Sequence, residues 1–187
     1  PKENAVKKLT GKHTLFLYAL SGMGINLLNM VIGSYLCDAL MTSGFDKNIE
    51  HWTYLNKTLV VPAVWAVMIT ISKIVDGIID IPLAAWTDRL HSRFGRRRPP
   101  ILIGMVGVIA AYVLFLIPLQ TTAESLLNTF WFGFLLCVFY TMYTMTMVTY
   151  YATFAEIVQN EPDRVRLSNY KSTFDIVYFV LGYALIP

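Results

Sequence analysis

Charged residues are scarce in this sequence. Asp, Glu, Lys and Arg together make up 14% of its 187 residues, whereas a soluble globular domain usually carries about 25%. Hydrophobic residues make up 56%, and the mean hydropathy is +0.53. Because so little charge is available to cover a water-facing surface, we exclude an ordinary soluble domain and expect the chain to lie in a lipid bilayer.

Residues that bind metals or form disulfides are equally rare. The two cysteines, Cys37 and Cys137, fall inside apolar runs and have no spacing typical of a metal site or a disulfide. His13, His51 and His91 lie in three separate regions, and none has a second ligand at helical spacing. The sequence therefore shows no metal centre and no catalytic constellation at a membrane interface. We expect a protein that is not an enzyme and that carries no cofactor.

What the sequence does contain is long apolar runs. A helix needs about 20 largely apolar residues to cross the hydrocarbon core. The runs are continuous, unlike the alternating segments of about ten residues that mark a membrane barrel. The sequence predicts an all-α, polytopic membrane protein with a cytoplasmic N-terminus at residues 1–13 and a helix bundle over 14–187. The expected helices cover residues 14–41, 58–86, 100–119, 127–155 and 172–187.

Basic residues alternate along the chain in a way that predicts its orientation. They gather before the first apolar run, after the second and after the fourth, and these ends should be cytoplasmic. A cleaved signal peptide is the alternative for the N-terminus, but the first run is long for one and shows no clear small-residue cleavage site. We expect a multi-pass protein of the cell membrane. The basic residues concerned are Lys2, Lys7, Lys8, Lys12, Arg89, Arg93, Arg96, Arg97, Arg98, Arg164, Arg166 and Lys171.

Two acids interrupt the second apolar run. Asp76 and Asp80 are four residues apart, so a helix places them on one face, with Lys73 one turn before them. A charge at the bilayer centre costs about 2.5–3.5 kcal/mol. Lys73 can neutralise one carboxylate, which leaves surplus negative charge and oxygen ligands for Na⁺ or a proton. The alternative is a buried ion pair that only fixes helix packing.

The same run carries a resemblance to a known family. The segment K-I-V-D-G-I-I-D-I-P-L, followed by T-D-R-L-H-S-R-F-G-R-R-R-P, resembles the second helix and following loop of the glycoside-pentoside-hexuronide:cation symporters. These are major facilitator superfamily transporters typified by melibiose permease. The resemblance covers the whole chain and implies the N-terminal half, with about five transmembrane helices, of a twelve-helix fold. The C-terminal half of the same protein, absent from this sequence, would then be its partner.

The resemblance implies symport of a sugar or glycoside, coupled to H⁺ or Na⁺, across the cytoplasmic membrane. The expected partners are a small-molecule solute and the lipid bilayer. The cation would bind at Asp76, Asp80 and Thr144, and no other metal is expected. The substrate-binding positions implied by the resemblance are Asn26, Lys73, Tyr143, Tyr151 and Lys171.

The arginine-rich loop after the second run has two readings. As a short loop between spans it does not resemble a basic nucleic-acid-binding face with stacking aromatics, so nucleic acid is not an expected partner. Asp88 could pair with the arginines and hold one state of an alternating-access cycle, whereas the alternative is simple positive-inside anchoring. The residues of this conformational latch are Asp88, Arg89, Gly95, Arg96, Arg97 and Arg98.

Some positions depart from the family pattern. Asn26 and Met147 stand where melibiose permease has sugar-binding carboxylates, so the charge-assisted grip on sugar hydroxyls is reduced. Ile79 replaces a polar side chain beside the cation, which thins the Na⁺ ligand set and favours H⁺ slightly. Two alternatives follow: the same fold carrying a non-sugar amphiphilic solute, or a non-transporting sensor or scaffold.

Overall fold

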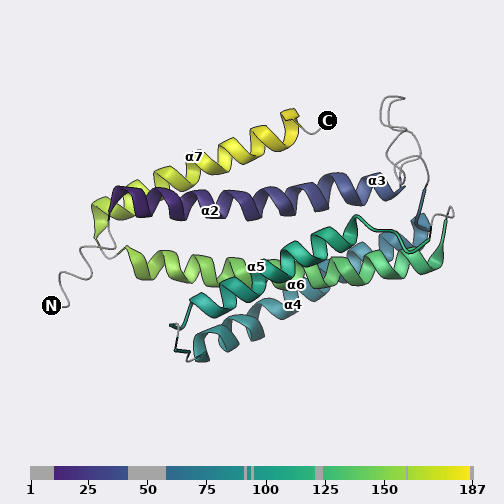
Figure 1. Cartoon of the computed structure of the whole chain (residues 1–187), viewed down its shortest axis with the longest axis horizontal. Coiled ribbons are helices and arrows are strands. Elements are labelled where there is room, and N and C mark those ends of the chain that lie inside the picture. Colours follow the sequence, from purple (N-terminus) through teal and green to yellow (C-terminus); the bar gives the residue numbers. More distant parts are fainter. Residues whose placement is uncertain are drawn as a thin grey trace. The chain divides into compact units, whose positions relative to one another are not determined.

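The computed structural model describes residues 11–41, 58–90, 92–93, 95–120, 124–158 and 160–185. All regular elements within these ranges are helical (Figure 1), which confirms the all-α prediction. Most of the expected cytoplasmic N-terminus and the connection at 42–57 lie outside the described residues. The elements are α2 (Lys12–Met30), the π-helical segment η1 (Val31–Leu36), α3 (Cys37–Met41), α4 (Pro62–Arg89), α5 (Arg98–Phe115), α6 (Leu126–Ile157) and α7 (Glu161–Leu185).

The largest difference from the expected boundaries is at the last helix. α7 begins at Glu161 rather than at residue 172, so it includes a charged stretch before the apolar run. Glu161 and Asp163 lie in its first turn, where negative charge is favoured by the helix dipole. Pro162 also suits the first turn, because the missing amide hydrogen would have had no partner there. The apolar run therefore marks only part of the helix.

Three helical segments among the described residues are long and apolar enough to cross a membrane. They are Lys12–Met41, Arg98–Phe115 and Leu126–Ile157. α4 and α7, which were also expected to span, do not meet this measure, and both carry charged residues along their length. Their insertion remains a prediction from the sequence.

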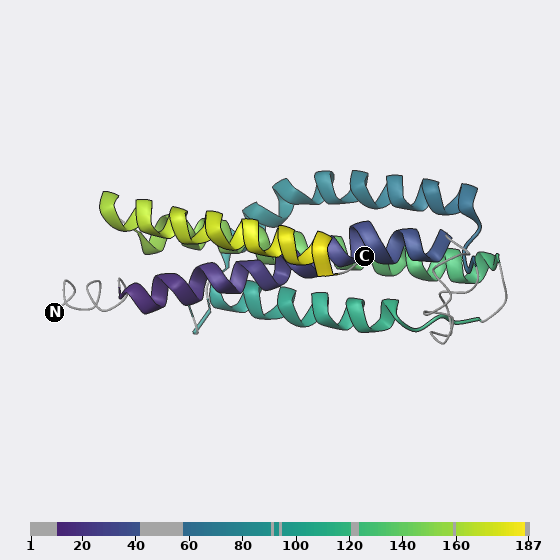
Figure 2. The ribbon, with the colours of Figure 1, turned by 90° about the horizontal axis from the view of Figure 1, so that it is seen from above.

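The chain divides into two compact units. The first comprises the residues up to Val31 and those from Thr149 onward, and so holds α2, α7 and the end of α6. α2 and α7 lie side by side and run in the same direction (Figures 1 and 2). The core of this unit is formed by buried apolar side chains, namely Leu15, Ala19, Val158 and Leu167.

A pair of tyrosines joins α2 to the end of α6 within the first unit. The rings of Tyr18 and Tyr150 stack with centroids 4.4 Å apart and planes at 4°. Each hydroxyl donates a hydrogen bond to the other residue's carbonyl oxygen, at 3.0 Å for the Tyr150 hydroxyl. A Cβ atom at Gly22 would lie 2.7 Å from the Tyr150 hydroxyl oxygen. A glycine is therefore needed for this close approach.

The second unit, Ile32–Val148, holds α3, α4, α5 and most of α6. A short loop joins α4 to α5, which run in opposite directions (Figure 2). Trp65 is fully buried. Its ring centroid lies 6.5 Å from that of Phe115, and the ring centroids of Phe115 and Phe132 are 5.1 Å apart. The Trp65 indole N–H donates to the Cys37 carbonyl oxygen at 3.3 Å. These contacts fix the first turn of α4 against its neighbours.

Glycines bring α6 close to both α4 and α5 in this unit. A Cβ atom at Gly104 of α5 would lie 2.1 Å from Thr146 Oγ1 and 3.0 Å from the Met142 carbonyl oxygen. A Cβ atom at Gly133 of α6 would lie 2.9 Å from the sulfur of Met68 in α4. Because small residues allow helices to approach closely, α6 can present its polar side chains directly to α4.

Candidate functional site

α6 brings a threonine hydroxyl to the first of the two acids in α4. Thr144 is 6% exposed, and its Oγ1 donates a hydrogen bond to Asp76 Oδ1 at 2.6 Å. The two residues are predicted members of one cation site, and the fold places them in contact although they are 68 positions apart. A hydroxyl oxygen that donates to a carboxylate keeps its own lone pairs available for a cation.

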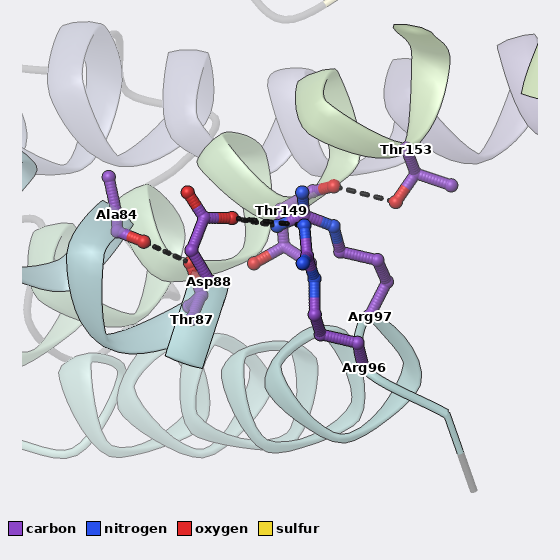
Figure 3. Close-up of polar contacts among 7 residues, drawn as sticks. All are labelled: Ala84, Thr87, Asp88, Arg96, Arg97, Thr149 and Thr153. Carbon is purple, nitrogen blue, oxygen red and sulfur yellow. Dashed lines mark hydrogen bonds and ion pairs between the residues drawn. The ribbon is translucent and has the colours of Figure 1, made fainter. Parts of the chain in front are cut away.

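Thr144 differs from Thr141, Thr146 and Thr153 of α6 in what its hydroxyl contacts. The hydroxyls of Thr141, Thr146 and Thr153 donate to the carbonyl four residues earlier, at 2.8, 2.9 and 2.7 Å, as Figure 3 shows for Thr153. Such back-bonding is the ordinary behaviour of a threonine in a membrane helix. Thr144 reaches instead across to the Asp76 side chain, so the contact belongs to α4 and α6 together.

Asp80 completes the predicted carboxylate pair. It is exposed, and no hydrogen bond or ion pair to it occurs in the part of the chain that the structure describes. Asp76 and Asp80 occupy the side of α4 opposite to Ile74, Ile78 and Ile81, of which Ile81 is 79% exposed. The exposed isoleucines suit contact with lipid, and the acids are turned away from them.

Lys73 contacts an aromatic ring rather than an acid. Its ammonium nitrogen lies 3.7 Å from the centroid of the Tyr140 ring, and within the described ranges it forms no ion pair with Asp76 or Asp80. The expected neutralisation of one carboxylate by Lys73 is therefore not seen. α6 presents a ring face at this turn, and a ring face attracts a cation that lies over it.

Sequence reasoning missed Tyr140. Its contact with Lys73 depends on the packing of α6 against α4, and the spacing of residues along the sequence does not predict that contact. The predicted cation set holds two carboxylates and a hydroxyl, an all-oxygen set that suits a hard cation or a proton. Among the described residues, no group of three or more His, Cys, Asp or Glu side chains could hold a metal ion.

The loop between α4 and α5 contains part of the predicted latch. Asp88 Oδ1 lies 2.7 Å from Arg97 Nη1 and 3.6 Å from Arg96 Nη2 (Figure 3). Gly95 has a φ of 96°, and its N–H donates to the Ser92 carbonyl oxygen at 3.0 Å. Residues with a Cβ rarely adopt this left-handed conformation, so glycine allows the turn that returns the arginines to Asp88.

The remaining latch residues lie at the helix ends. Arg89 is in the last turn of α4, where positive charge is favoured by the helix dipole. Arg98 is the first residue of α5 and precedes two prolines that begin the helix. The structure thus joins Asp88 to two of the four predicted arginines through side-chain contacts.

Three predicted solute-binding residues belong to the first unit. Lys171 of α7 forms an ion pair with Asp175 at 2.7 Å, and its ammonium nitrogen lies 5.3 Å from the centroid of the Tyr151 ring. Asn26 lies half-buried on α2. Asp175 was missed, although its position four residues after Lys171 in a helix is a signal that the sequence contains.

The other two predicted solute-binding residues, Lys73 and Tyr143, belong to the second unit. Tyr143 is half-buried and its ring stacks on that of Phe139, with centroids 6.2 Å apart and planes at 10°. Ile79 is also half-buried, and Met147 is 5% exposed. Lys73 contacts Tyr140 and stands one helical turn before Asp76 on α4.

Comparison with known proteins places the chain in a family. A family model described as MFS/sugar transport protein matches residues 17–187. The chain is also 32% identical over 124 residues to an uncharacterized symporter of Synechocystis sp.. That match covers 63% of this chain and 22% of the relative, so the matched segment spans about a fifth of the relative's length. No solved structure matches. This chain belongs to the MFS/sugar transport protein family of multi-pass membrane transporters.

Proposed function

We propose that the protein is a secondary active transporter that carries a sugar or glycoside together with H⁺ or Na⁺. The observation that supports this most directly is the hydrogen bond from Thr144 to Asp76, with Asp80 one turn further along the same face of α4. Two acids in an apolar helix are costly, and a bound cation would offset that cost.

Coupling follows from the same charges. A cation at Asp76 and Asp80 would neutralise part of the negative charge and stabilise the state that binds the solute. By thermodynamic linkage, the solute then raises the affinity for the cation by the same factor. Because Lys73 is engaged with Tyr140, Lys73 does not compete with an external cation for the two carboxylates in this arrangement.

The oxygen ligands of the site bear on which cation is coupled. Asp76, Asp80 and Thr144 supply the oxygen atoms, whereas Ile79 on the same helix supplies none. A thin oxygen set suits a proton better than Na⁺, which needs several ligands. The proposal therefore includes both ions and slightly favours H⁺.

The solute would contact the residues of the first unit that combine an aromatic face with charged groups. Tyr151 offers a ring and Lys171 an ammonium group beside it, and Asn26 adds an amide. The proposed orientation has a cytoplasmic N-terminus, which places the loop of Asp88 on the cytoplasmic side.

Uptake into vesicles tests the proposal. The full-length protein is reconstituted in proteoliposomes, and uptake of radiolabelled methyl galactoside is measured with an imposed Na⁺ gradient, an imposed pH gradient, or neither. We expect one gradient to drive accumulation in the wild type and not in Asp76→Asn. Asp163→Asn, which removes a carboxylate from an ion pair at the start of α7, is the matched control. Equal uptake by wild type and Asp76→Asn in all three conditions would contradict coupling.

The same assay separates the proposal from its two alternatives, because neither alternative accumulates methyl galactoside. A non-transporting sensor or scaffold would accumulate no solute under any gradient. A carrier of non-sugar amphiphiles would ignore methyl galactoside under either gradient. Of the two replacements that raised the amphiphile alternative, Met147 is buried and offers little surface to any solute in this structure, whereas Ile79 is half-buried.

A further inference from the structure

The proposed solute site includes Lys171 but not Asp175, its ion-pair partner on α7. Lys171 Nζ and Asp175 Oδ2 are 2.7 Å apart, and the two side chains are 24% and 37% exposed. The ammonium nitrogen also lies 5.3 Å from the centroid of the Tyr151 ring, and Tyr151 is 47% exposed. A cation, an anion and an aromatic face are thus accessible together within the first unit.

The aromatic face is held in place by its neighbour. Tyr150 stacks on Tyr18 and donates to its carbonyl oxygen at 3.0 Å. The Tyr151 ring stands at 75° to the Tyr150 ring, with centroids 5.6 Å apart. Because Tyr150 is fixed on both its ring and its hydroxyl, Tyr151 rests against a rigid support. The aromatic platform beside Lys171 is therefore preorganised.

We propose that Asp175 sets the charge class of the solute: by pairing with Lys171, it makes this subsite neutral and selects uncharged, hydroxyl-bearing solutes over sugar acids. The inference rests on the proposed function, because it assumes that Lys171 and Tyr151 contact the solute. It adds Asp175 to that site as a specificity-determining residue.

The hydrogen-bonding capacity of the pair favours a hydroxyl group. The Lys171 ammonium has three donors, of which Asp175 takes one. The Asp175 carboxylate keeps acceptor positions free. A sugar hydroxyl can accept from Lys171 and donate to Asp175 at once, and both bonds are charge-assisted. The pair thereby provides a carboxylate grip on hydroxyls that Asn26 and Met147 do not supply.

A sugar carboxylate interacts less favourably with the pair than a hydroxyl group does. It is attracted by Lys171, but it is repelled over a similar distance by Asp175, and it cannot donate a hydrogen bond to Asp175 when ionised. Removing the negative charge of Asp175 would release the ammonium as a full partner for an anion. Discrimination between neutral and acidic sugars therefore depends on this one carboxylate.

Paired binding measurements test this role. Methyl galactoside and galacturonate share a ring and differ in charge, so the ratio of their dissociation constants on the full-length protein reports charge selection. We expect the wild type to prefer methyl galactoside, and Asp175→Asn to shift the ratio toward galacturonate by about tenfold or more. Asp175→Glu keeps the charge and should keep the preference. Lys171→Gln combined with Asp175→Asn should lose the acquired affinity for galacturonate.

Another ion pair on the same helix provides the control. Arg166 Nη1 and Asp163 Oδ1 are 3.6 Å apart, and Asp163→Asn removes a carboxylate from α7 without touching the subsite. Its ratio should equal that of the wild type. An unchanged ratio in Asp175→Asn would overturn the role of Asp175 alone. Failure of the wild type to bind either probe would overturn the proposed sugar function and this inference with it.

Discussion

The ammonium nitrogen of Lys73 lies 3.7 Å from the centroid of the Tyr140 ring. Lys73 precedes Asp76 by one helical turn, yet its charge is directed to α6. Cation–π contacts contribute about 0.5–1 kcal/mol at exposed sites, which is comparable to an exposed ion pair, and Lys73 is exposed in this structure. The contact keeps a positive side chain near the two acids without neutralising them.

Substitution of Tyr140 tests this arrangement. In Tyr140→Leu the ring is lost, so Lys73 becomes available to Asp76 and Asp80 and competes with the coupling ion. We expect the ion concentration for half-maximal uptake to rise about tenfold, which corresponds to about 1.4 kcal/mol. Tyr140→Phe keeps the ring face and should behave as the wild type. Equal behaviour of the two variants would show that the ring face has no such role.

Thr144 gives a second prediction. Thr144→Ala removes the hydroxyl that donates to Asp76 at 2.6 Å, and hydrogen bonds to charged groups contribute about 1.5–3 kcal/mol. We expect the apparent affinity for the coupling ion to fall by roughly tenfold or more. Thr144→Ser retains the hydroxyl and should retain most of the affinity. The measurement is uptake against ion concentration, and Thr146→Ala, which loses a bond to its own helix and leaves the hydroxyl bonded to Asp76 in place, is the control.

The contact of Asp88 with Arg97 predicts that the loop between α4 and α5 is protected from trypsin. In Asp88→Asn the loop between α4 and α5 loses its ion pairs, so trypsin should cleave more readily after Arg96 and Arg97. An exposed pair is worth about 0.2–1 kcal/mol, so the rate should rise by no more than a few fold. The difference should shrink in high salt, which screens exposed charges.

Digestion of the full-length protein in membranes, followed by mass spectrometry, would locate and time the cuts. Asp163→Asn breaks an ion pair elsewhere and should leave this loop unchanged. Cleavage at the wild-type rate in Asp88→Asn at low salt would mean that the contact does not restrain the loop.

Gly104 provides a test of helix packing. A Cβ atom there would lie 2.1 Å from Thr146 Oγ1 and 3.0 Å from a backbone oxygen, so Gly104→Ala should destabilise the protein by about 1–3 kcal/mol through overpacking. Gly24 has open space around its Cβ position, and Gly24→Ala should be neutral or slightly stabilising. Thermal unfolding in detergent measures both. A larger loss for Gly24→Ala would contradict the packing of α5 on α6.

The helices could be predicted because apolar runs of this length have few other structures available in a membrane. The ends of the helices were harder to predict. α7 begins at Glu161, before the apolar residues start, because helix formation depends on capping and dipole effects as well as on hydropathy. Hydropathy locates the part of a helix that suits lipid, and the charged turn before it carries no such signal.

In the candidate site too, some features could be predicted from the sequence and others could not. Helical periodicity alone places Asp76 and Asp80 on one side of α4, and the spacing of Lys171 and Asp175 could have revealed their ion pair. The partner of Lys73 could not be read from the sequence. An ion pair with an acid three residues away was the local expectation, and Tyr140 supplies the contact from another helix.

The sequence by itself determined the membrane class, the helical fold and the faces on which charged residues stand, because these depend on composition and on a period of about 3.6 residues. Only the tertiary structure decided which groups meet. Thr144 reaches Asp76, and Tyr140 takes Lys73, because glycines allow α6 to approach its neighbours closely. Side-chain contacts between helices depend on the packing of whole segments, and local spacing does not contain that information.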